Sequence, residues 1–198
     1  MSAQSVARIT PEEYLEAERK AEFKHEYFDG EVFAMSGGTF PHGTIIGNLT
    51  GEFRNALKGR SCTVTPNDVR LRVGSGRMYT YPDILVVCGE PKFADDQKDT
   101  LLNPTLIVEV LSLSTEAHDR GLKFRQYRTI ESLREYVVVS QYEPRVEKFR
   151  LQPAEDWLMT ECAGLEGTCR FESVNCEVAM SEIYYNVTFG ATSSLTGA

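Results

Sequence analysis

Apolar residues recur with a helical period in one stretch of the chain and with strand-like periods in others. Between residues 41 and 59, one helical face is apolar and predicts an amphipathic helix. That face carries Ile45, Ile46, Leu49, Phe53 and Leu57. Thr10-Pro11-Glu12-Glu13 has the capping threonine, early proline and third-position glutamate of a helix start, so another helix is expected to run to about Ala21. A further helix is predicted from about Glu116 to Ile130.

The strand signals are of two kinds. Two short alternating runs flank Asp29-Gly30, a strong hairpin signal, and residues 61–73 alternate as one strand. Residues 81–88 and 104–112 are nearly continuous apolar runs, which is typical of central strands buried on both faces. The remaining expected elements are a strand at 135–140, an antiparallel pair at 145–151 and 157–164, and a helical turn at 181–185. This order predicts an α/β or α+β fold, with a mixed central sheet flanked by helices.

Length and composition are those of an ordinary globular protein. The chain has 198 residues, of which 41% are hydrophobic and 25% charged. We therefore expect one domain over residues 1–198, with its core at about 10–185. No run approaches the roughly 18 apolar residues of a membrane span, and the N-terminus lacks the apolar core of a signal peptide. The expected location is the cytoplasm, away from the membrane.

The five cysteines lack the close spacing of a zinc or redox motif. They stand at positions 62, 88, 162, 169 and 176. The last three recur every seven residues, which leaves a metal site open, but they fall in predicted short strands where a free cysteine is commonly a small buried apolar residue. We expect all five to be free thiols in a reducing compartment.

The net charge of −8 argues against a constitutive, sequence-blind nucleic-acid binder, which usually carries a basic surface. The charge is uneven, however. Residues 54–78 hold six basic side chains and one acid, Asp68. Such a strip can meet a phosphate backbone, although scattered arginines on a solvated face explain the same charge count equally well.

Two of the most apolar predicted strands each contain one acid. Asp83 stands near the start of one strand, and Glu109 lies inside the run Leu106–Leu111. A buried carboxylate must be paired, protonated or bound to a metal, since desolvating an unpaired one costs several kcal/mol. Two acids on neighbouring strands favour a hard cation such as Mg²⁺. The alternative is that each acid caps a turn or pairs with an arginine.

The helix that follows adds a lysine. Asp119, Lys123 and Tyr127 are spaced four residues apart and share one helical face. Phosphodiester cleavage needs positive charge near the phosphorus and a positioned water, and Lys123 can supply that charge or help to deprotonate the water. The alternative is an exposed helix lysine.

The ordered set of motifs resembles the PD-(D/E)XK nuclease superfamily. More narrowly, the chain is similar to the restriction-endonuclease family once catalogued as a domain of unknown function, the Uma-two family, over about residues 10–150. The residues that carry the resemblance are His25-Glu26-Tyr27-Phe28-Asp29-Gly30-Glu31, Met35-Ser36, Pro41-His42, Pro82-Asp83, Glu109-Val110-Leu111-Ser112, Asp119-Arg120, Lys123, Tyr127 and Glu135-Tyr136. The resemblance implies a restriction-endonuclease-like fold.

The resemblance also implies a metal site. Asp83, Glu109 and the backbone carbonyl of Val110 would bind Mg²⁺ (or Mn²⁺). The usual Glu-x-Lys of the superfamily would place a lysine where this chain has Leu111. The resemblance implies that the lysine has moved to the next helix, as Lys123; the alternative is an impaired site.

Several supporting residues are expected around this centre. Glu26 and Glu31 are the candidates for an additional upstream acid, and the sequence does not decide between them. His42 can approach phosphate or water, or can serve as a helix cap or packing residue. Ser112 and Tyr127 are expected to support the metal ligands, or else to make strand-end and packing contacts.

The leading functional hypothesis is therefore a Mg²⁺-dependent endonuclease that hydrolyses DNA phosphodiester bonds. The first alternative is a catalytically impaired protein of the same fold that binds nucleic acid or another partner, which Leu111 and the acidic balance favour. The second is a hydrolase of another phosphodiester, such as RNA. A homodimer is a further expectation, because nucleases that cut both strands often pair their sites about a two-fold axis.

Overall fold

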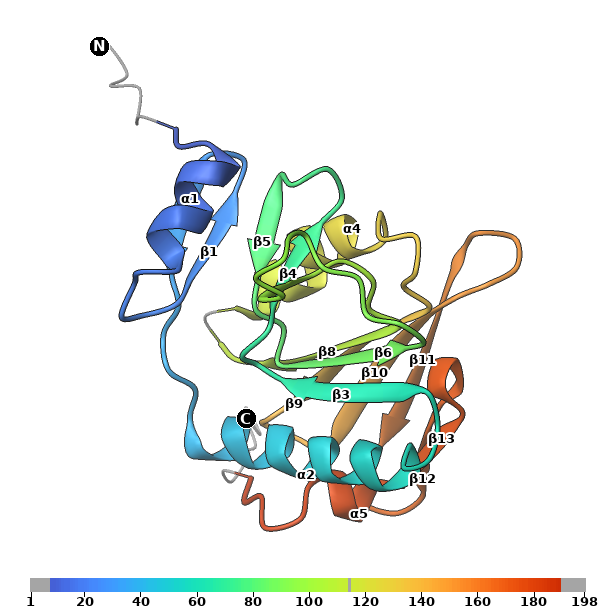
Figure 1. The fold of residues 1–198 in the computed structure, drawn as a ribbon. Coiled ribbons are helices and arrows are strands. Elements are labelled where there is room, and N and C mark those ends of the chain that lie inside the picture. The colour runs from blue at the N-terminus through green and yellow to red at the C-terminus, as the bar shows by residue number, and fades with distance from the viewer. Residues whose placement is uncertain (1–7, 114, 190–198) are drawn as a thin grey trace.

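A computed structural model describes residues 8–113 and 115–189. The fold is built around a six-stranded mixed sheet of order β11-β10-β9-β8-β6-β3 (Figure 1). Strands β8 and β9 are parallel, and the other neighbours are antiparallel. Every residue of β8 is buried, as predicted for a central run, and so is every residue of β9, which the sequence predicted only as a strand. The strands are β3 (Cys62–Pro66), β6 (Ile84–Cys88), β8 (Leu106–Leu111), β9 (Glu135–Ser140), β10 (Arg145–Leu151) and β11 (Trp157–Ala163).

One face of this sheet is covered by the predicted amphipathic helix, α2 (Phe40–Ala56), together with the C-terminal segment (Figure 1). The five apolar positions that predicted the helix are all buried, and Phe53 meets Phe171 edge to face. The C-terminal segment comprises β12 (Thr168–Phe171), the 3₁₀ turn η2 (Glu172–Val174), β13 (Cys176–Ala179) and α5 (Met180–Ile183).

A second sheet of order β2-β1-β5-β4-β7 and a broken helix pack on the opposite face. Here Leu71 and Met78 meet Ile107, Leu111 and Tyr127. The strands are β1 (His25–Phe28), β2 (Glu31–Ala34), β4 (Arg70–Val73), β5 (Met78–Thr80) and β7 (Thr100–Leu101). The mixed sheet flanked by helices confirms the predicted fold class.

The N-terminal prediction is confirmed. Helix α1 (Pro11–Glu18) begins with the reciprocal capping box between Thr10 and Glu13, although it ends at Glu18 rather than Ala21. The β1–β2 hairpin turns at Asp29 and Gly30, which both have positive φ, as the tight turn requires.

Two element predictions are wrong in detail. Residues 61–73 form two strands in different sheets, β3 and β4, separated by a turn whose Asn67 amide donates to the carbonyl of Asp83 at 2.9 Å. The alternation identifies the strand period but cannot reveal this change of partner. The helix expected at 116–130 is divided into α3 (Glu116–His118), the π-helical segment η1 (Asp119–Lys123) and α4 (Phe124–Tyr127). Gly121, a residue with poor helix propensity, lies at the centre of η1.

The expectation of five free cysteines is also wrong. Cys62 and Cys88 are paired residues on β3 and β6 and form a disulfide. A search for closely spaced cysteines misses this pair, because 26 residues separate them and only the strand register brings them together. Cys169 and Cys176 are buried free thiols, as predicted, and Cys162 is half-buried.

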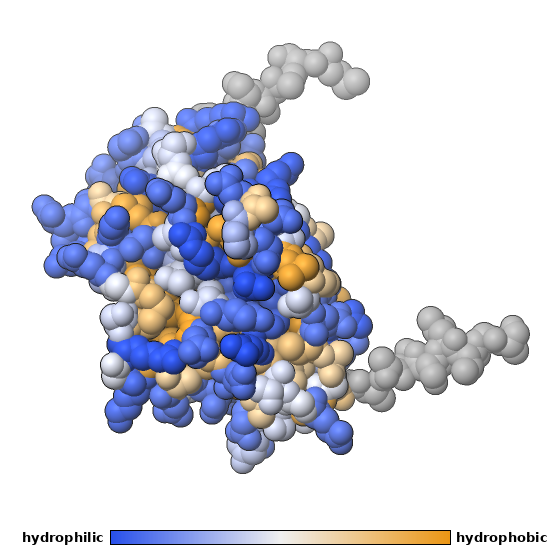
Figure 2. Space-filling model, turned by 90° about the vertical axis from the view of Figure 1, so that its right-hand side faces the viewer, coloured by the Kyte–Doolittle hydropathy of each residue, from blue (hydrophilic) through white to orange (hydrophobic). Residues whose placement is uncertain are grey.

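The basic residues between positions 54 and 78 do not form one continuous strip. Arg70 is buried and paired with Asp99, while Arg77 pairs with Asp29. Arg54 and Lys58 lie at or just after the C-terminal end of α2. Hydrophilic side chains cover most of the face in Figure 2, with smaller hydrophobic patches between them. No helix within the described ranges is long and apolar enough to cross a membrane.

Candidate active site

Asp83 and Glu109 lie side by side where β6 begins next to β8. Because Ile84 is paired with Val108 in an antiparallel register, Asp83 falls beside Glu109. The Val110 amide donates to Asp83 Oδ2 at 2.7 Å, and the Asp83 amide is 3.4 Å from Glu109 Oε2. Within the described residues neither acid is paired with an arginine. The two predicted acids are therefore brought together, and neither forms an ion pair with an arginine among the described residues.

The Glu109 carboxyl is buried on the side of the sheet that faces the broken helix. Side chains alternate along a strand, so Glu109 shares its face with Ile107 and Leu111, and it is only 3% exposed. Burial raises the pKa of Glu109 to about 8; nearby Lys123 opposes that shift, while Asp119, Asp83 and Glu26 add to it. This position strongly favours a partner that carries positive charge.

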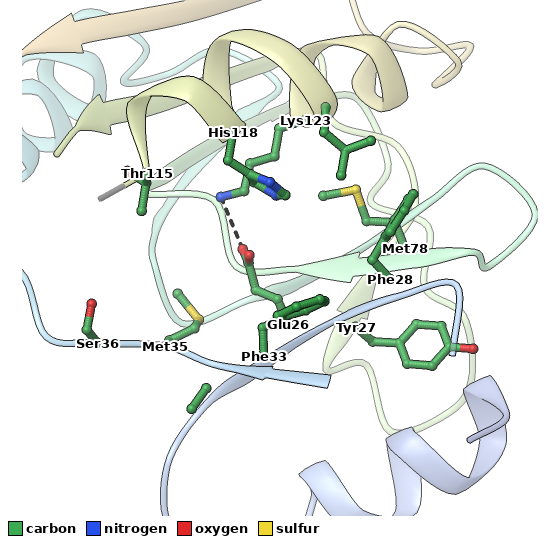
Figure 3. A pocket seen from close by; sticks show the side chains of 12 residues that line it. Glu26, Tyr27, Phe28, Phe33, Met35, Ser36, Met78, Thr115, His118 and Lys123 are labelled. Carbon is green, nitrogen blue, oxygen red and sulfur yellow. Dashed lines mark ion pairs between the residues drawn. The ribbon is translucent and has the colours of Figure 1, made fainter. Parts of the chain in front are cut away.

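Lys123 supplies a cation at this position. Its Nζ lies 3.2 Å from Glu109 Oε1, 3.1 Å from Glu26 Oε1 and 3.2 Å from Asp119 Oδ1. Figure 3 shows Lys123 reaching across to Glu26. Burial would lower the pKa of Lys123, but the three carboxylates outweigh burial and raise it well above its usual value. Lys123 is 6% exposed, so the alternative of a solvated helix lysine is wrong.

The η1 segment and α4 position this lysine together with a tyrosine. Asp119, Lys123 and Tyr127 point to the same side, as their spacing predicts, and all three are buried. The Tyr127 hydroxyl donates to Glu109 Oε1 at 2.7 Å, the same oxygen that Lys123 contacts. Short π-helical segments inside helices are frequent at functional sites.

His42 joins the site from the start of α2. Thr39 caps that helix, and its hydroxyl accepts the His42 amide hydrogen bond at 3.3 Å. The imidazole Nε2 lies 3.3 Å from Asp83 Oδ2. Burial would lower the pKa of His42, but its hydrogen bond to Asp83 and the charge of that residue raise it. His42 therefore contacts a candidate metal ligand directly, which the sequence left open.

The structure distinguishes the two upstream acids. Glu26 points to Lys123 and accepts a short hydrogen bond from Thr80, whereas Glu31 lies exposed on β2, opposite Phe28. Glu26 therefore belongs to the cluster and Glu31 does not.

Ser112 follows β8 and takes part in the turn into α3. Its hydroxyl is 2.9 Å from that of Thr115, and its carbonyl accepts from the amides of Thr115 and Glu116. These contacts with the turn are of the strand-end kind, and the supporting role of Ser112 stays a prediction.

Sequence reasoning missed two polar residues that support the site. Thr80 is fully buried and holds Glu26. Gln141 donates to the Leu111 carbonyl at 2.7 Å and accepts from the Thr39 hydroxyl at 2.5 Å, so it ties the end of β8 to the cap of α2. In the sequence, the only indication of a role for Gln141 was its position directly after an apolar strand, and nothing indicated a role for Thr80.

The donor set suits a hard divalent cation such as Mg²⁺. Asp83 and Glu109 are neighbours on adjacent strands, where Glu109 Oε2 is 3.4 Å from the Asp83 amide and Asp83 Oδ2 accepts from the Val110 amide. No group of three or more His, Cys, Asp or Glu side chains within the described residues is arranged to hold a metal ion. Mg²⁺ commonly binds through one or two carboxylates and completes its shell with water and phosphate oxygens, so this sparse set fits that ion.

The comparisons with known proteins agree on one family. The profile of the Uma2 family, described as "Putative restriction endonuclease", matches residues 11–178. Two uncharacterized proteins of Synechocystis sp. (strain ATCC 27184 / PCC 6803 / Kazusa) are similar. Protein slr1290 is 36% identical over 184 residues, which is 92% of this chain and 94% of that protein. Protein sll1609 is 35% identical over 163 residues, which is 82% of this chain and 92% of that protein.

A solved structure has a similar fold. It is described as a putative nuclease belonging to DUF820 from Anabaena variabilis ATCC 29413 and superimposes with a TM-score of 0.72. The match covers 89% of this chain and 97% of the other at 16% sequence identity, so it supports the fold alone.

Proposed function

The chain belongs to the Uma2 family of restriction-endonuclease-like proteins, and on this premise we propose that it is a metal-dependent endonuclease that hydrolyses DNA phosphodiester bonds. The observation that carries the proposal is that Glu109 lies next to both other residues: its Oε1 is 3.2 Å from Lys123 Nζ, and its Oε2 is 3.4 Å from the Asp83 amide. Three acids (Glu26, Glu109 and Asp119) contact this one lysine, and Asp83 lies next to Glu109 on the neighbouring strand. The excess of negative charge favours binding of a further cation.

In this proposal Asp83, Glu109 and the carbonyl of Val110 hold Mg²⁺ or Mn²⁺. Such an ion, when bound, polarises a phosphate oxygen and lowers the pKa of a bound water. The chain arranges its own groups for this task, because Lys123 and Tyr127 both contact Oε1 of Glu109 and so fix the carboxylate. The Val110 amide fixes Asp83 in the same way.

Lys123 has a second role in the proposal, as the cation that offsets charge at the phosphate. Its ammonium group is held in place by Glu26 and Asp119, so it does not need to reorganise when the substrate binds. His42, at 3.3 Å from Asp83, positions that acid and can donate a hydrogen bond to it. A two-fold dimer would supply two such sites, one for each strand of a duplex.

A second candidate function is a nuclease-fold protein that binds nucleic acid without cutting it. The observation in its favour is Leu111, which is buried in an apolar cluster where the superfamily usually carries its lysine. The position of Lys123 beside Glu109 argues for the catalytic alternative.

Cleavage of supercoiled plasmid with Mg²⁺ or Mn²⁺, compared with EDTA, tests the proposal. Wild-type protein is expected to nick or linearise the plasmid, whereas Asp83→Asn and Glu109→Gln are expected to lose cleavage while staying folded. Glu31→Gln is the matched control, because Glu31 is exposed and outside the cluster. Either site variant cutting as well as wild type would refute the assignment, and labelled RNA in parallel reactions shows whether DNA is the preferred substrate.

A further inference from the structure

A cavity of about 520 Å³ lies between the β1–β2 hairpin and the helical segment that carries Lys123 (Figure 3). Most of its lining is apolar. The apolar side chains include Phe28, Phe33, Met35, Met78 and Leu122. Glu26 and Lys123 also line the cavity, and both belong to the charged cluster described above. The cavity therefore borders the charged cluster, next to Glu109, which contacts Lys123 from the other side of its lining.

The chemistry of this cavity suits a flat aromatic group with polar edges. Phe33 lines the cavity and is 49% exposed on β2, at the edge of its sheet, so its ring is accessible to a ligand there. Methionine side chains adapt to flat rings and pack favourably against them. Ser36, Thr115 and His118 add groups that can form hydrogen bonds with a ligand.

Charge decides which part of a nucleotide fits here. The carboxylates of Glu26, Glu109 and Asp119 share the single ammonium group of Lys123, so a phosphate placed beside Lys123 would meet a net negative charge in the absence of a metal. An uncharged base has no such penalty, and it gains from stacking on an aromatic side chain.

We propose that this cavity accommodates one unpaired nucleobase of the nucleic-acid substrate, stacked against Phe33, while the neighbouring phosphate lies at Asp83 and Glu109. This inference rests on the proposed nuclease function and deepens it. A base inside a duplex is accessible only after unpairing and unstacking, which costs a few kcal/mol. The substrate class is therefore DNA with unpaired bases: single strands, gaps or bulges.

Binding measured with Ca²⁺, a cation that takes oxygen ligands and can offset the charge of the acids, tests the inference, and gel analysis of the recovered probe checks that it stays intact. The probe is a single-stranded oligonucleotide with one 2-aminopurine, whose fluorescence changes when the base stacks. Wild-type protein is expected to bind it with a fluorescence change, and Phe33→Ala is expected to bind about 5- to 100-fold more weakly and to lose that change. Phe23→Ala, which removes a 70% exposed ring outside the cavity, is the matched control and should behave as wild type.

The outcomes separate this inference from the proposed function. Equal binding by Phe33→Ala and wild type, or no binding by wild type, overturns the base pocket whatever the cleavage result. Base binding that depends on Phe33, without cleavage under Mg²⁺ or Mn²⁺, supports the pocket and refutes the nuclease. Two further arms identify the occupant. If adenosine monophosphate displaces the probe as well as an unlabelled oligonucleotide does, the cavity is a site for free nucleotides. If wild type sediments as a dimer and Phe33→Ala as a monomer, a second copy of the chain covers the ring. Either result overturns the inference.

Discussion

Lys123 places its Nζ 3.2 Å from Oε1 of Glu109, although the two residues are 14 positions apart and belong to a helical segment and a strand. Position 111, two residues after Glu109, is instead a leucine in the apolar cluster. The helical segment that packs on the sheet thus places a lysine beside Glu109. In the related superfamily, the lysine usually lies on the strand itself, two residues after the glutamate. This relationship makes Lys123 the residue with the most informative variants.

Replacing Lys123 with methionine should destabilise the protein. Methionine keeps the apolar stem but leaves Glu26, Glu109 and Asp119 without their shared cation, and breaking a buried ion pair from one side costs about 3–5 kcal/mol. Urea unfolding measures the loss. Lys20→Met, at an exposed surface pair with Glu16, is the control and should leave the urea midpoint unchanged. A Lys123→Met protein as stable as wild type would show that the buried cluster does not depend on this ammonium group.

Glu26 and Glu31 provide a matched pair on one hairpin. Glu26→Gln should lower the rate of DNA cleavage about 10- to 100-fold, because it removes one of the carboxylates that hold Lys123 in place. Glu31→Gln should cut at the wild-type rate, because Glu31 is exposed on β2. Initial rates at saturating Mn²⁺ compare the two, and equal rates would exclude a role for Glu26.

The raised pKa of Glu109 predicts how stability depends on pH. The pKa is about 8 in the folded protein, above its ordinary value, so the folded state binds more protons between these values. The contribution of this group to stability is therefore fully present below the ordinary pKa and is lost as pH rises through about 8. Metal-free wild type should lose up to about 1.4 kcal/mol per pH unit relative to Glu109→Gln within this window. Urea titrations at pH 5 to 9 measure the difference, and a constant difference would contradict the buried position of this carboxyl group.

The Cys62–Cys88 disulfide should stabilise the protein under oxidising conditions. It closes a loop with a sequence separation of 26 residues, and removing such a link typically costs about 2–4 kcal/mol. Dithiothreitol is therefore expected to lower the thermal midpoint of wild type but not that of the Cys62→Ser, Cys88→Ser double variant. If dithiothreitol leaves the thermal midpoint of wild type unchanged, these two cysteines are not linked in solution.

Local patterns predicted most elements but not the way in which distant segments meet. The capping box at Thr10, the turn at Asp29-Gly30 and the apolar face of α2 are each determined by neighbouring residues, so the sequence was sufficient. The change of sheet after Pro66 depends on which strand each segment finds as a partner. No local signal describes that choice.

The same distinction holds for the site. Asp83 and Glu109 were recognisable because a charge inside an apolar run is costly to bury, and Lys123 because it shares a helical face with Asp119. Thr80 and Gln141 were not recognised, since neutral polar residues are common and only their contacts reveal their role. The choice between Glu26 and Glu31 likewise required the hairpin to be placed against Lys123.

The most direct test of the account is the position of Mn²⁺ in crystals soaked with that ion, located by its anomalous scattering. We predict one peak bonded to the carboxylates of both Asp83 and Glu109, absent from crystals of Asp83→Asn. Well-diffracting soaked crystals with no peak between these two acids, or with the ion bound elsewhere, would contradict the account.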